Sequence, residues 1–150
     1  MILYQVYLVV QDDVGSGVYS FIRKRTTVDE EGGKQGSIYQ LTDVMKKDGE
    51  VFETKRIISA REYNTSYRSR DLSRHIVIQE RISFLYKLQS FTIHIYDTPS
   101  SGLCILHAQV ENNDNEDPVV DLPDFLNIDR LLAQSDESTY GSYALSVDHN

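Results

Sequence analysis

Residues 75–111 constrain the fold more than any other part of the chain, because apolar and polar side chains alternate there in three successive runs. A repeat of two residues, rich in β-branched and aromatic side chains, is typical of strands with one apolar and one polar face. Short, turn-like breaks separate the runs at residues 88–90 and 98–102. The pattern therefore predicts three consecutive antiparallel strands.

The polar faces of these predicted strands differ from an ordinary solvated surface. They carry Gln79 and Arg81 in the first run, His94 in the second and His107 in the third. A face that only contacts water is usually richer in Lys, Glu and Ser. The composition therefore favours a wall that lines a polar cavity.

Further strands are predicted at residues 1–10, 18–26, 37–44 and 51–58. The first of these runs is almost entirely apolar, which is typical of a central strand buried on both faces. An Asp-Gly pair at residues 48–49 predicts the hairpin turn between the last two. The fold class is therefore mainly β.

Two helices are predicted beside the strands. Ser59 and Glu62 have the spacing of a capping box, which predicts a helix over Ala60–Arg68. Apolar residues at helical spacing over residues 122–132 predict a second helix that covers the core. The final stretch, residues 138–146, is interpreted as a short strand or a docked tail.

Length and composition narrow the class of protein. A chain of 150 residues suits one domain with a core that needs neither disulfides nor metals. The single cysteine, Cys104, excludes an internal disulfide and favours a reducing, cytoplasmic compartment. No apolar run approaches the roughly 20 residues that span a bilayer. With a net charge of −8, the chain is not expected to bind DNA or long RNA.

The basic residues are nevertheless unevenly distributed, since all of them except Arg130 lie in residues 1–87. Arg23 and Arg25 are two positions apart on a predicted strand and therefore point the same way, either into a cavity or to solvent. Arg81 is placed either to bind an anion or to form a structural ion pair with Glu53, and Lys55 shares a strand face with that carboxylate.

His94 and His107 lie on adjacent predicted strands and allow two interpretations. They could hold a metal ion, but His75 and His149 are not placed to supply a third ligand. Polar lining of a cavity is the preferred interpretation. An ordinary histidine pKa near 6.5 would then let mild acid add positive charge.

Laid out in this way, the chain resembles a CYTH domain, the triphosphate tunnel fold. It is most similar to the C-terminal domain of the TRPL translocation defect protein and AAA-ATPase–CYTH group, in which a P-loop domain precedes the CYTH domain. The resemblance covers nearly the whole chain and implies one domain, residues 1–150, from the C-terminal part of a longer protein. It depends on YQVYL at 4–8, IRKR at 22–25, ETKRIISAREY at 53–63, FTIHIY at 91–96, GLCIL at 102–106, LPDFL at 122–126 and YGSYALS at 140–146.

The resemblance implies a closed antiparallel β-barrel of about eight strands, a tunnel whose inward side chains hold phosphates. In catalytic members an E-x-E-x-K strand binds a divalent metal and triphosphate chains are hydrolysed. This chain departs from that pattern: Gln5 and Tyr7 stand in place of the two carboxylates, His94 and His107 in place of later acids, and Val44 in place of a lysine. Mg²⁺ prefers carboxylate oxygens, so metal binding should be weakened.

The basic side chains of the pattern remain, and they set the functional expectation. A degenerate CYTH-like tunnel would bind a phosphate-rich anion, such as a phosphoinositide head group, a nucleotide or polyphosphate, without catalytic residues, metal or cofactor. Lipid head groups would give it peripheral contact with membranes. The predicted phosphate ligands are Arg23, Arg25, Lys55 and Arg81, and the predicted lining residues are Gln5, Tyr7, Glu53, Gln79, His94 and His107.

Two alternatives remain open from the sequence. One is a surviving triphosphatase or inorganic polyphosphate hydrolase that uses Mg²⁺ or Mn²⁺ with Glu53, Glu80 or Glu111 as replacement ligands. The other is a structural domain that partners a P-loop NTPase domain.

Overall fold

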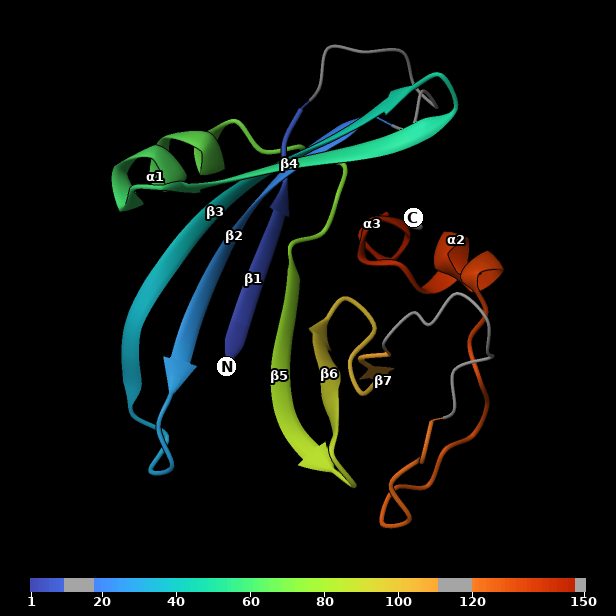
Figure 1. Ribbon diagram of the computed structural model, residues 1–150. Coiled ribbons are helices and arrows are strands. Elements are labelled where there is room, and N and C mark those ends of the chain that lie inside the picture. Colours follow the sequence, from blue (N-terminus) through green and yellow to red (C-terminus); the bar gives the residue numbers. More distant parts are fainter. Residues whose placement is uncertain (10–17, 111–119, 148–150) are drawn as a thin grey trace.

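The computed structural model describes residues 1–9, 18–110 and 120–147 of the chain (Figure 1). The strands in these parts are β1 (Ile2–Tyr7), β2 (Tyr19–Val28), β3 (Lys34–Lys47), β4 (Glu50–Ile58), β5 (Val77–Tyr86), β6 (Gln89–Thr98) and β7 (Cys104–Ala108). The helices are α1 (Ala60–Arg68), α2 (Glu137–Tyr140) and α3 (Ser142–Leu145), with a 3₁₀ turn at Gln134–Asp136. Glu111 and His149 lie outside the described residues, as does the end of the first predicted strand.

All seven strands form one antiparallel sheet in the order β4-β3-β2-β1-β5-β6-β7. Strand β1 is at its centre, as its apolar sequence predicts, and pairs with β2 on one side and β5 on the other. The three-strand prediction for residues 75–111 is confirmed by β5, β6 and β7. The predicted turn is also confirmed, with Asp48 and Gly49 at φ 54° and 79°.

The expectation of a closed barrel with eight strands is wrong for the described part of the chain. The sheet curls strongly but stays open, because β4 and β7 each pair with a single neighbour. The curl wraps around α3, which lies inside it (Figure 1). Side chains of this C-terminal segment pack against the inner sheet face at the end where Tyr7 and Tyr19 lie. The result is a curled half-barrel.

Each face of the sheet has its own hydrophobic core. The outer face, which α1 covers, is packed around Val6, Ile22, Ile58 and Tyr63. The inner face, which α3 covers at one end, is packed around Tyr7, Phe21, Val44, Val77 and Tyr96. The capping box of α1 is confirmed, since the Glu62 amide donates to Ser59 Oγ at 3.1 Å and Glu62 accepts from the Ser59 amide at 3.0 Å.

The helix predicted over residues 122–132 is wrong, because this segment has no regular helix. Two of its side chains contact the sheet: Pro123 is buried, and the Phe125 ring lies 5.8 Å from those of Phe84 and Tyr86, whereas Leu122, Leu131 and Leu132 are exposed. Asn and Asp within the segment have low helix propensity, so packing on the sheet decides the conformation instead.

The predicted docking of residues 138–146 is confirmed, although the segment forms α2 and α3 rather than a strand. Tyr143 stacks on Tyr19 with ring centroids 4.1 Å apart. The Arg74 guanidinium lies 3.6 Å from the centroid of the Tyr143 ring. Arg74 also donates to the Tyr143 carbonyl oxygen at 2.7 Å. No helix in the described residues is long and apolar enough to cross a membrane.

Candidate functional site

The strand register brings three arginines together on the inner face. Arg23 lies opposite Gln5, and Arg25 lies opposite Leu3. Leu3 lies opposite Gln79 on its other side, which places Arg81, two residues further along β5, on the same face. Side chains that alternate along a strand share a face, so Arg23, Arg25 and Arg81 (the arginine cluster) face the interior of the curl. The strand register therefore gives the three arginines the inward orientation that the sequence analysis considered.

Buried amides hold two members of the arginine cluster. Arg23 donates from Nε to Gln5 Oε1 at 2.8 Å, and Arg81 donates from Nε to Gln79 Oε1 at 3.0 Å. Gln5 is 2% exposed and Gln79 is fully buried. Each amide is fixed in turn, since Gln5 donates to Tyr7 Oη at 2.6 Å and Gln79 donates to Ser142 Oγ at 3.3 Å. Two relays therefore orient the guanidinium groups through Nε.

These partners are neutral, so they leave the arginine charges uncompensated. The ion pairs found within the described residues involve none of the three arginines. Burial first, and then the charges of Arg23 and Arg25, lower the pKa of Arg81 to about 10. Burial and then Arg25 also lower the pKa of Arg23. The cluster is a region of mutual repulsion that an anion would relieve.

The two predicted lining histidines form a stacked pair beside the cluster, with ring centroids 4.0 Å apart. Burial, followed by the charge of Arg81, lowers the pKa of His94 to about 3 and also lowers that of His107. The expectation that mild acid would charge these side chains is therefore wrong for His94, which stays neutral. A neutral imidazole can still donate one hydrogen bond and accept another.

This shift makes acid stability a test of the site. Because the folded-state pKa of His94 lies below the ordinary value, the unfolded chain takes up the proton first as the pH falls from about 6.5. Stability contributed by the neutral ring is lost on acidification, by less than about 1.4 kcal/mol per pH unit because the ring is only partly buried. We expect His94→Gln to lose less thermal stability than the wild type between pH 7 and pH 4.5, measured by circular dichroism. An equal loss in both proteins would contradict a neutral His94.

Lys55 and Glu53 share the inner face but form no ion pair with the arginine cluster, although the Glu53 charge opposes part of the lowering of the Arg23 pKa. They lie on the edge strand β4, both about half exposed, and pair with each other at 3.4 Å. The possible Arg81–Glu53 bridge is absent because β3, β2 and β1 separate the two strands. Lys55 is thus placed on the predicted face, but its charge is already partnered.

Two polar residues of the inner face were missed by sequence reasoning. Gln40 lies opposite Arg23 and accepts from Arg25 Nη2 at 3.4 Å, and Thr42 is fully buried opposite Phe21. Within the described residues, Thr42 Oγ1 and Arg25 Nε are buried without a hydrogen-bond partner. Val44, which stands in place of a lysine of the family pattern, lies on the inner face, and counting back from it in steps of two reaches both residues.

Carboxylates do not gather on the inner face in the described part of the chain. No three His, Cys, Asp or Glu side chains there come close enough together to hold a metal ion. Glu53 and Glu80, the two described candidates for replacement ligands, lie on opposite faces of the sheet. Apart from the Glu53–Lys55 ion pair at its edge, the described inner face provides guanidinium, amide, hydroxyl and imidazole groups.

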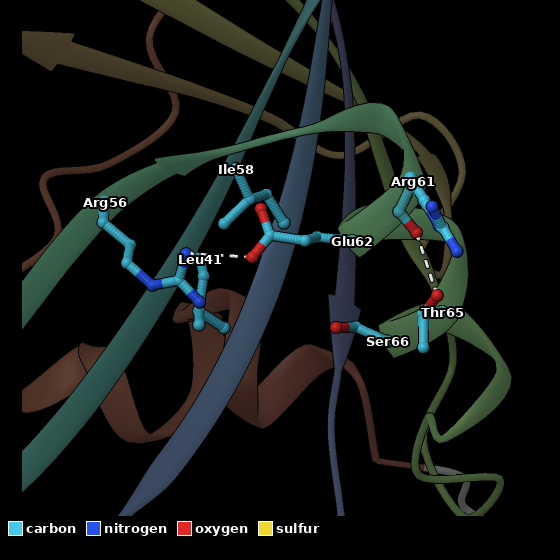
Figure 2. Close-up of a pocket in the computed structure, with 7 residues that line it drawn as sticks. All are labelled: Leu41, Arg56, Ile58, Arg61, Glu62, Thr65 and Ser66. Carbon is cyan, nitrogen blue, oxygen red and sulfur yellow. Dashed lines mark hydrogen bonds and ion pairs between the residues drawn. The ribbon is translucent and has the colours of Figure 1, made fainter.

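A separate pocket of about 240 Å³ lies on the outer face between β3, β4 and α1 (Figure 2). Arg56 points across it to Glu62, with Nη1 and Oε1 3.3 Å apart. The Glu62 pKa is lowered, first by the Ser59 backbone and then by the Arg56 side chain. The charges of Arg56 and Glu62 compensate each other, which distinguishes this pocket from the arginine cluster.

No family model, curated protein or solved structure matches this chain. The evidence on its function is therefore the chemistry of the inner face.

Proposed function

We propose that the inner face of the half-barrel binds a phosphate-rich anion through the arginine cluster. The observation that carries the proposal is the pairing of half-buried Arg23 and Arg81 with the neutral, buried amides of Gln5 and Gln79 instead of carboxylates. Keeping unpaired cations in a partly buried site is costly, and an anionic ligand offsets that cost. The planar guanidinium fork also matches the geometry of phosphate oxygens.

The spacing of the cluster favours a ligand with more than one phosphate. Arg23 and Arg25 are two residues apart on one strand, which separates their Cα atoms by roughly 7 Å. Arg81 is two strands away from them across β1, or roughly 10 Å. Phosphoinositide head groups, nucleotides and polyphosphate all present phosphates at such separations. The resemblance to CYTH domains points to the same ligands, which here would lie in an open trough in place of a tunnel.

A panel of ligands tests the proposal directly. We expect inositol phosphates, nucleoside triphosphates or tripolyphosphate to raise the melting temperature of the wild type, and the shift to shrink as ionic strength rises. Arg23→Ala should abolish the shift. Lys24→Ala is the matched control, because Lys24 neighbours Arg23 on β2 but points to the outer face.

Two other results would contradict the proposal. No shift with any phosphorylated compound at low salt would contradict the proposal and favour a structural role beside another domain. Phosphate release from tripolyphosphate on addition of Mg²⁺ or Mn²⁺, lost on removal of Glu53, would favour the triphosphatase alternative.

A further inference from the structure

Strand β4 forms an unusually open edge of the sheet. Among the described strands it pairs with β3 alone, and its register shows no bulge over nine residues. Every residue before Ile58 is exposed, including Val51 at 64% and Ile57 at 67%. Natural sheets usually protect such an edge with charged side chains, proline, a bulge or a short strand, because unpaired backbone groups are a template for another strand. Of these devices β4 has only charged side chains, and they are of both signs. An edge of this length with apolar side chains is suited to pairing.

The sequence of β4 is complementary to itself. If a second copy pairs with it in antiparallel orientation about Thr54, Glu53 lies opposite Lys55 of the second copy, and Lys55 lies opposite Glu53. Val51 then meets Ile57, and Phe52 meets Arg56. Each of these pairs is favourable in a sheet: opposite charges, apolar contacts and a cation against an aromatic ring.

Other registers are disfavoured by the same residues. A shift by two positions in one direction puts Glu53 opposite Glu53, and a shift in the other direction puts Lys55 opposite Lys55. Like charges directly opposite each other destabilise a strand pair. A shift by one position would turn the second sheet over, so that its outer face would continue the inner face of the first copy. Among these registers, the one about Thr54 alone pairs opposite charges and keeps the two inner faces on the same side.

We propose that two copies of this chain associate through β4, in antiparallel register about Thr54, to join their sheets across a two-fold axis. Such an isologous contact would pair the outward-facing backbone N–H and C=O groups of β4 in both copies at once. Helix α1 packs over the outer face against Val6 and Ile22 and contacts β4 through the Arg56–Glu62 ion pair. The Glu53–Lys55 pair, 3.4 Å apart within one chain, becomes part of a four-charge network in the dimer. The contact is independent of anion binding.

The mass in solution tests the dimer. Sedimentation analysis from about 10 μM to about 1 mM should show a concentration-dependent approach to twice the chain mass of 17.2 kDa, because a single strand pair buries a small interface. Glu53→Lys and Lys55→Glu should each weaken association by roughly tenfold or more, since each creates four like charges. Mixed together, the two variants should form a heterodimer of near wild-type affinity. Both side chains are exposed, so the fold should be retained, as circular dichroism would verify.

Cross-linking tests the register. In a Cys104→Ser background, which removes the one free cysteine, Thr54→Cys should form a disulfide dimer on mild oxidation, because residue 54 lies opposite itself. Phe52→Cys, which lies opposite Arg56, is the control and should remain uncrosslinked. A chain that is monomeric at all concentrations, a mixture of charge variants that fails to associate, or cross-linking at residue 52 in preference to 54 would each overturn the proposal.

Discussion

The double variant Arg23→Ala/Arg81→Ala is expected to bind a phosphate-rich ligand roughly 1,000-fold more weakly than the wild type. Hydrogen bonds to charged groups contribute about 1.5–3 kcal/mol each, and a factor of ten in affinity corresponds to about 1.4 kcal/mol. Both guanidinium groups are pre-oriented through Nε by Gln5 and Gln79. Little conformational freedom is therefore left to lose on binding, which supports a large effect. Isothermal titration calorimetry with the best ligand of the panel measures it.

Substitution by lysine separates geometry from charge in the same experiment. Arg81→Lys keeps a positive charge but loses the planar fork and the Nε hydrogen bond to Gln79. We expect an affinity between those of the wild type and the alanine variant. Affinities that are equal for Arg81→Lys and the wild type would show that charge alone determines binding. Unchanged affinity in the double alanine variant would contradict the assignment of the site.

The variant Tyr143→Ala is expected to lower the free energy of unfolding by about 3 kcal/mol, which is typical for removal of a packed aromatic ring. The Tyr143 ring lies 4.1 Å from that of Tyr19, nearly parallel to it, and 5.2 Å from that of Tyr7 at an angle of 67°. The Arg74 guanidinium covers it at 3.6 Å. Removal of the ring therefore takes away three contacts that hold α3 on the inner face. Urea denaturation followed by circular dichroism measures the loss.

The variant Tyr143→Phe is the matched control, because it keeps the ring and removes only the hydroxyl. We expect its stability to stay within about 0.5 kcal/mol of the wild type. A comparable loss in both variants would show that the hydroxyl, not the ring stack, anchors the segment. A loss below about 1 kcal/mol in Tyr143→Ala would show that α3 is not part of the cooperative fold.

Residue patterns predicted the strands well because local sequence determines their alternation. The period of two around Arg23, His94 and His107 identifies which side chains share a face before any pairing is known. The capping box at Ser59 likewise determines its helix from four adjacent residues. The sequence therefore showed that Arg23 and Arg25 share a face, whereas the hydrogen bond from Arg23 to Gln5 depends on the register between β1 and β2.

Features that depend on distant contacts were not predictable in this way. Closure of the sheet depends on whether β4 and β7 meet, which no local pattern in either strand reveals. The apolar spacing around Phe125 suggested a helix, whereas contacts with Phe84 and Tyr86 on the sheet determine an irregular path. The neutrality of His94 depends on its burial and on Arg81, a residue from another strand. Spatial environment, not sequence, changes its pKa.

The amide relays have a consequence for the proton balance of ligand capture. Carboxamides do not titrate, and His94 and Arg81, with pKa values of about 3 and about 10, keep constant charge near neutrality. Arg23 and Arg81 therefore meet the ligand without exchanging protons with the buffer through their partners. Calorimetric heats measured in buffers of different ionisation enthalpy should then report only the protonation of the phosphate itself, whose second pKa is near 6.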